Sequence, residues 1–145
     1  MANEVWEYIS AREYMCSHCG KLPPGLVRTD DGSWPLIFEY LFTRFADIRE
    51  AWGRPIQITS GYRCPAHNKA ISGTELGTHV FGLALDLAVN LDEMDAMVGI
   101  IDAVHPELRV GTNRKPGHIH IHTDVGYLIH PIYSDKLVEG LRFEE

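Results

Sequence analysis

The chain has 145 residues, of which 45% are hydrophobic and 23% charged, which is the size and composition of one soluble globular domain. Its net charge of −7 argues against a protein that binds nucleic acid through basic side chains. No apolar run approaches the roughly 20 residues of a membrane span. The N-terminus lacks the basic-then-apolar pattern of a secretory signal, so we expect synthesis in the cytoplasm and no membrane insertion.

The predicted elements are a turn-rich N-terminal segment, residues 1–33, followed by mixed helices and strands. Apolar residues recur at three- and four-residue spacing from about Pro35 to Trp52, which predicts an amphipathic helix ended by Gly53 and Pro55. The later predictions, in chain order, are a strand at 56–59, a loop or short helical turn at 63–70, a loop at 72–78, a strand at 83–89, a helix at 91–104, strands at 108–111 and 117–123, and a helix at 135–143. This mixture predicts an α+β domain.

Two of the predicted strands carry side chains that can bind a metal. His118, His120 and His122 alternate, so they share one face of a strand, and Asp86 lies on the opposite face of its strand from the leucines. His79 precedes Asp86 by seven residues, and imidazole and carboxylate are standard zinc ligands. A catalytic zinc has three protein ligands and an open position for water, which predicts a site made from His79, Asp86 and one late histidine. The alternative is a buried His79–Asp86 hydrogen bond beside a wet strand face.

Three segments, in this order, resemble the zinc D-alanyl-D-alanine carboxypeptidase and murein peptidase family, which is structurally similar to the hedgehog signalling domain and to lysostaphin-type peptidases. The segments are SGYRCPAHN at 60–68, HVFGLALD at 79–86 and HIHTD at 120–124. A CxxCG segment like that at 16–20 also precedes this domain in relatives.

The resemblance implies a small, mainly antiparallel central sheet flanked by helices. It also implies a single zinc peptidase domain over residues 1–145, with a catalytic core over residues 35–126.

The resemblance also implies roles for individual residues. His79, Asp86 and His122 would bind zinc, and His120 would be a second active-site histidine that moves a proton or stabilises an oxyanion. Arg63 would hold a carboxylate or a peptide carbonyl of the substrate, because a guanidinium offers a planar fork of donors. The alternative for Arg63 is an arginine that pins a loop by binding backbone carbonyls.

Two positions depart from the family pattern. Gly77 stands where many relatives have serine, and Ile119 stands where several carry an acidic general base. The base is therefore open between His120, which we favour, and Glu75, which lies in the loop before the first ligand. Asp124 could orient a ligand imidazole.

The cysteines form a separate pattern. Cys16 and Cys19 have the spacing of a metal knuckle, with His18 between them. A structural zinc would need a second pair of ligands, which Cys64 and His67 could supply. The sequence favours free thiols, or a disulfide formed outside the cell, over this site. Three cysteines are an odd number, which argues against a complete disulfide framework.

The predicted function is a zinc metallopeptidase that cleaves peptide bonds involving D-amino acids in bacterial peptidoglycan stem peptides, as a D,D-carboxypeptidase or a murein endopeptidase. The missing signal, wall-binding module and basic surface suit a phage or prophage lysis enzyme, an endolysin that acts on the cell wall. We expect a monomer with stem peptides as partners and no nucleic acid. The alternative is an inactive zinc-containing binding domain or a phage structural protein.

Overall fold

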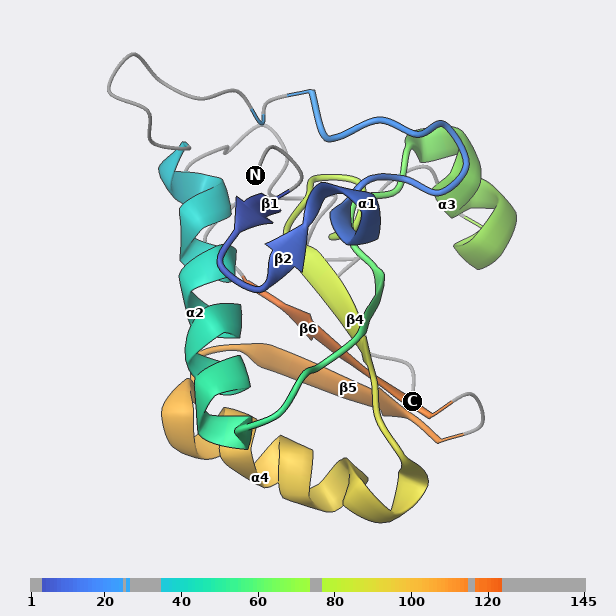
Figure 1. The fold of residues 1–145 in the computed structure, drawn as a ribbon. Coiled ribbons are helices and arrows are strands. Elements are labelled where there is room, and N and C mark those ends of the chain that lie inside the picture. Colours follow the sequence, from blue (N-terminus) through green and yellow to red (C-terminus); the bar gives the residue numbers. More distant parts are fainter. Residues whose placement is uncertain (1–3, 25, 27–34, 74–76, 115–116, 124–145) are drawn as a thin grey trace.

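The computed structural model describes residues 4–24, 26, 35–73, 77–114 and 117–123. Its centre is a four-stranded antiparallel sheet (Figure 1). The strands, in spatial order, are β3 (Ile58–Ser60), β4 (Ala84–Ala88), β6 (His118–His122) and β5 (Arg109–Asn113). All four predicted strands are present, and the α+β fold with a small antiparallel sheet is confirmed.

Both long predicted helices are also present: α2 covers Leu36–Trp52 and α4 covers Met94–Val104, after a 3-10 turn at Leu91–Glu93. α2 ends at Gly53, whose φ of 81° lets its N–H reach the Arg49 carbonyl oxygen. The segment predicted as a loop or short helical turn is an eight-residue helix, α3 (Pro65–Ser72). The predicted helix at 135–143 lies outside the described residues.

The N-terminal segment is more regular than the sequence predicts. It contains a short antiparallel pair, β1 (Glu4–Trp6) and β2 (Ile9–Ser10), and one helical turn, α1 (Ala11–Tyr14). Elements of two to four residues are too short to show a hydrophobic period, which is why the sequence did not predict them. Glu13 completes a capping box with Ser10 and accepts a hydrogen bond from the Ile58 backbone N–H of β3 (3.3 Å). The segment is thereby fastened to the edge of the sheet.

The two faces of the sheet differ in chemistry. Leu85 and Leu87 of β4 and Ile119 and Ile121 of β6 are fully buried in a core that also contains the apolar faces of α2 and α4. The opposite face presents the alternate residues, and the β4–β6 register pairs Ala84 with His122, Asp86 with His120 and Ala88 with His118. This confirms that Asp86 and the alternating histidines share one face, away from the core.

Gly82 lies in the turn that leads from His79 into β4, and its conformation and its contacts both require a glycine. Its φ is 76°, and an added Cβ would lie 2.7 Å from the Tyr14 hydroxyl and 2.8 Å from the Phe38 ring. The Tyr14 hydroxyl also donates a hydrogen bond to the Gly82 carbonyl oxygen. The N-terminal segment therefore packs directly against this turn.

We expect Gly82→Ala to destabilise the fold more than Gly53→Ala, the matched control. Gly53 has a similar φ of 81°, but a Cβ atom added there would meet no atom within 4 Å. Gly53→Ala therefore introduces only backbone strain, which costs about 1 kcal/mol. Gly82→Ala adds overpacking, which costs about 1–3 kcal/mol more. Denaturant unfolding of both variants measures the difference, and equal losses would contradict the close packing of Tyr14.

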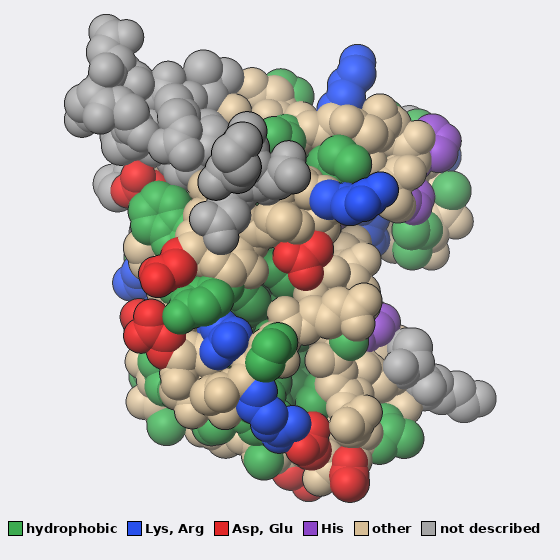
Figure 2. Space-filling model, in the orientation of Figure 1, with side chains coloured by type: hydrophobic (Ala, Val, Ile, Leu, Met, Phe, Trp, Pro, Cys, Tyr) green, Lys and Arg blue, Asp and Glu red, His purple; other side chains and the backbone are tan. Residues whose placement is uncertain are grey.

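Acidic and basic side chains are interspersed over the face shown in Figure 2, without a continuous basic patch on that face. No helix among the described residues combines the length and the apolar character needed to cross a membrane.

Candidate metal centre

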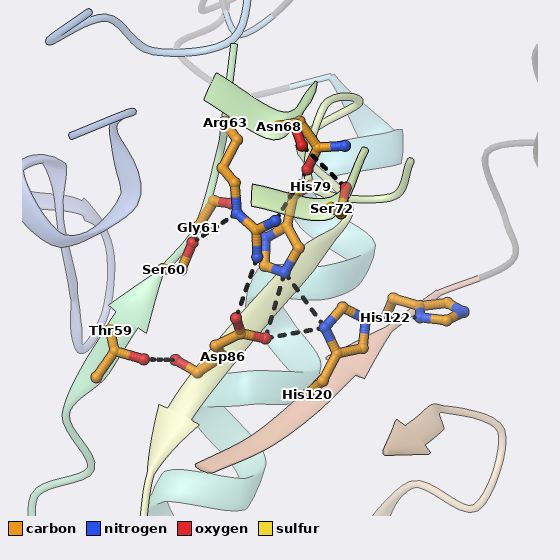
Figure 3. A network of polar contacts seen from close by, with 10 residues as sticks. All are labelled: Thr59, Ser60, Gly61, Arg63, Asn68, Ser72, His79, Asp86, His120 and His122. Atoms are coloured by element: carbon orange, nitrogen blue, oxygen red, sulfur yellow. Dashed lines mark hydrogen bonds and ion pairs between the residues drawn. The ribbon is translucent and has the colours of Figure 1, made fainter. Parts of the chain in front are cut away.

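Asp86 and His120 on the polar face of the sheet and His79 in the turn before β4 converge on a common point (Figure 3). The Nε2 atom of His79 lies 3.2 Å from Oδ1 of Asp86, and Nδ1 of His120 lies 2.8 Å from the same oxygen. The two imidazole nitrogens are 3.2 Å apart. Ligand atoms about 2.0–2.1 Å from a tetrahedral zinc are separated by about 3.3 Å. Two of the three separations are close to this value and the third is shorter, so the three donors could bind one metal ion after a small adjustment.

A backbone carbonyl orients the first imidazole. Nδ1 of His79 donates a hydrogen bond to the carbonyl oxygen of Gly61, at 2.6 Å. In a neutral imidazole this leaves the lone pair on Nε2, which is the nitrogen that faces Asp86. A second ring nitrogen fixed in this way is the usual arrangement of a metal-binding histidine.

The protonation states also suit a divalent cation. Burial raises the pKa of Asp86, but the neighbouring imidazoles of His120 and His79 outweigh it and hold that pKa well below its usual range. Burial lowers the pKa of His79, and burial and the neighbouring His120 lower the pKa of His122 to about 2. At neutral pH the carboxylate is ionised and these two imidazoles are neutral, the forms that bind metal.

These pKa values predict how the stability of the metal-free protein depends on pH. His79 and His122 titrate near 6.5 when unfolded but at lower pH when folded, so below that pH the unfolded state binds more protons. We expect the free energy of unfolding to fall between about pH 7 and pH 5, with a slope approaching about 1.4 kcal/mol per pH unit for each histidine. Denaturant unfolding after chelation measures the slope, which should be shallower in His122→Gln. A free energy that stays constant would contradict neutral, buried imidazoles.

His122 lies beside this group rather than within it. It is 1% exposed, and its Nδ1 lies 3.0 Å from Nε2 of His120. The structure therefore brings His79, Asp86 and His120 together, whereas the resemblance assigns the third ligand position to His122; that assignment stays a prediction. His118, two residues before His120 on β6, is partly exposed on the same face. Glu75 and Asp124 lie outside the described residues.

Arg63 contacts the second oxygen of the candidate carboxylate ligand. Its Nη2 donates to Asp86 Oδ2 at 3.3 Å, its Nη1 to Asn68 Oδ1 at 2.9 Å and its Nε to Ser60 Oγ at 3.2 Å. The Arg63 and Asp86 side chains are 12% and 9% exposed, so this ion pair is largely shielded from water. Arg63 thus links the end of β3 and helix α3 to the candidate carboxylate ligand, Asp86 (Figure 3).

The sequence did not predict that Gly61, Ser60 and Asn68 orient His79 and Arg63 through hydrogen bonds. Gly61 acts through its carbonyl oxygen, for which no side chain gives a signal. Asn68 is 3% exposed on α3, and a polar residue buried on a short helix is recognisable only once its partner Arg63 is placed beside it.

No curated protein matches the chain. The family model for Peptidase M15 matches residues 10–122, a span that includes His79, Asp86 and both His120 and His122. The chain therefore belongs to the Peptidase M15 family of D-Ala-D-Ala carboxypeptidase-like zinc metallopeptidases.

Proposed function

We propose that the protein is a zinc peptidase that cleaves peptide bonds involving D-amino acids in peptidoglycan stem peptides, as a D,D-carboxypeptidase or a murein endopeptidase. The observation that carries the proposal is the convergence of donor atoms from His79, Asp86 and His120 in a member of the M15 family. The protonation states and the carbonyl that orients His79 support the same conclusion.

The third metal ligand is one member of the His120–His122 pair. His79 and Asp86 would hold zinc together with one of these imidazoles. The other imidazole lies within hydrogen-bond distance of the first (3.0 Å) and would exchange a proton with the substrate. Zinc bound here would polarise the scissile carbonyl and lower the pKa of a bound water. The two histidines occupy neighbouring positions on the same face of β6, two residues apart, so either imidazole is placed near the His79–Asp86 pair.

Arg63 is proposed to bind a substrate carboxylate or peptide carbonyl in addition to Asp86. A guanidinium has five N–H donors, so a substrate oxygen can share it with the contacts already described. A pocket of about 320 Å³ adjoins Arg63 and is large enough for part of a peptide. Its lining combines charged and neutral polar side chains with apolar ones: Arg12, Glu13, Met15, Ser17, Gln57, Ile58, Thr59, Ser60, Tyr62 and Arg63.

The test is digestion of purified peptidoglycan by the zinc-loaded protein, with the products identified by mass spectrometry. We expect new fragments that disappear on chelation and are absent with His79→Ala. The mass of the fragments identifies the bond, since a carboxypeptidase releases a terminal D-alanine and an endopeptidase separates cross-linked stems. A folded protein that holds zinc and binds muropeptides without cleaving them would instead establish the binding-domain alternative.

A further inference from the structure

All three cysteines of the chain gather at one place outside the His79–Asp86 group. The sulfur atoms of Cys16, Cys19 and Cys64 lie within 4.8 Å of one another, and none forms a disulfide. Cys16 and Cys19 belong to the turn that follows α1, whereas Cys64 is the N-cap of α3. Figure 1 shows the N-terminal segment running alongside α3. Residues more than forty positions apart are thus brought together by the fold.

A histidine supplies a fourth donor. Nδ1 of His67, in the first turn of α3, lies 3.4 Å from the sulfur of Cys16. A tetrahedral zinc with Zn–S bonds of about 2.3 Å and Zn–N bonds of about 2.0 Å separates sulfur and nitrogen by about 3.5 Å. His18 lies near the same cluster, with its Nδ1 3.7 Å from the Cys64 sulfur, but it is exposed, whereas His67 is partly buried. The geometry therefore favours His67 as the fourth ligand.

The backbone around Cys16 is folded to present its sulfur. The N–H of Gly20 donates to the Cys16 carbonyl oxygen at 2.8 Å, and Gly20 has a φ of 70°, which closes the turn. The Cys16 N–H donates to the carbonyl oxygen of Lys21 at 2.9 Å. These two hydrogen bonds hold the turn in the conformation that places the Cys16 sulfur beside the other two cysteines.

We propose that Cys16, Cys19, Cys64 and His67 bind a structural zinc ion, at a second metal site with no residue in common with the His79–Asp86 group. Three thiolates and one imidazole complete a tetrahedral shell, which leaves no open position for a water or a substrate. The histidines visible at the end of the molecule that carries α3 show that this region reaches the surface, so an ion can enter (Figure 2).

The proposed cysteine site lies next to a residue that contacts the His79–Asp86 group. Cys64 directly follows Arg63, which contacts Asp86, and the Tyr62 N–H donates to the Tyr14 carbonyl oxygen at 2.7 Å, two residues before Cys16. An ion held between Cys16 and Cys64 would therefore fasten the N-terminal segment to the loop that carries Arg63. Metal binding to such a site adds its free energy to folding, so loss of the ion should lower the unfolding temperature.

The test is to count metal ions per chain in the reduced full-length protein by elemental analysis and native mass spectrometry. We expect two zinc ions in the wild type, one in Cys19→Ser and one in Asp86→Asn. Cys19 is chosen because its side chain is exposed and serine is nearly isosteric with it, so the fold should survive the change. Ser17→Ala, an exposed change in the same turn, is the matched control and should keep both ions.

Cobalt(II) identifies which site is filled without any measurement of activity. We expect thiolate-to-cobalt charge-transfer absorption in the wild type and in Asp86→Asn. It should be lost in Cys19→Ser and in the double variant that combines Cys19→Ser with Asp86→Asn. If Cys19→Ser does not fold, the Asp86→Asn variant decides on its own, because it should still hold one ion with this absorption. A wild type that binds one ion without the absorption, or a disulfide among these cysteines that persists in the presence of reductant, would overturn the proposal.

Discussion

Asp86→Asn is expected to remove zinc from the His79–Asp86 group and to abolish peptidase activity. Loss of a residue that merely orients a metal ligand costs roughly 10–100-fold in metal affinity, so loss of a charged ligand should cost more. The same change also leaves the buried Arg63 guanidinium without its anion, 3.3 Å away. Breaking a buried ion pair typically costs about 3–5 kcal/mol, so the metal-free variant should also unfold at lower denaturant concentration.

Asp47→Asn is the control for this substitution. Asp47 also contacts an imidazole, His105 at 2.7 Å, but its side chain is 57% exposed, and exposed pairs of this kind contribute about 0–1 kcal/mol. Zinc content, rate of cleavage and denaturant midpoint should therefore stay close to those of the wild type. An Asp86→Asn protein that retains full zinc content and full activity would show that the carboxylate is not a ligand.

Substitutions of His120 and His122 by alanine are expected to give two different defects. The variant that lacks the third ligand should lose zinc and activity together. The variant that lacks the proton-transferring imidazole should keep zinc and lose about 10²–10⁴-fold in kcat. Measurement of zinc content and kcat in both variants assigns the two roles. The family resemblance predicts that His122→Ala loses zinc. The observed three-donor group instead predicts that His120→Ala loses zinc.

His118→Ala provides the comparison on the same strand. It removes an imidazole from the same face of β6 and should keep zinc, since His118 is not part of the three-donor group. Zinc retention in both His120→Ala and His122→Ala would contradict the proposed division of roles. If both keep activity as well, Glu75→Gln becomes the informative variant, because Glu75 is the other predicted base.

The elements that the sequence predicts correctly are those with a repeated pattern. α2 spans almost five turns of apolar residues at helical spacing, and β4 and β6 alternate over five residues each. Strand alternation also predicts that Asp86 and the histidines avoid the core. Alternation within one strand cannot predict the register of β4 against β6, because the register depends on pairing between segments about thirty residues apart. This register places Asp86 opposite His120.

The contacts that the sequence could not predict are those between distant segments. His120 and His122 have the same orientation on β6, so alternation alone does not distinguish which one faces His79. The sequence offers Cys64 and His67 as partners of the Cys16–Cys19 knuckle, but only the packing of the N-terminal segment against α3 shows that they approach it. The SGYR motif identifies Arg63 as a candidate site residue from the sequence. Its ion pair with Asp86 could not be predicted, because it depends on the pairing of β3 with β4.

Anomalous diffraction at the zinc absorption edge, from crystals of the zinc-loaded protein, tests the proposed metal centre most directly. We expect an anomalous peak about 2.0–2.2 Å from Nε2 of His79 and from a carboxylate oxygen of Asp86, with one imidazole of the His120–His122 pair as the third ligand. Anomalous peaks confined to other places, with none at this group, would contradict a zinc peptidase centre built from these residues.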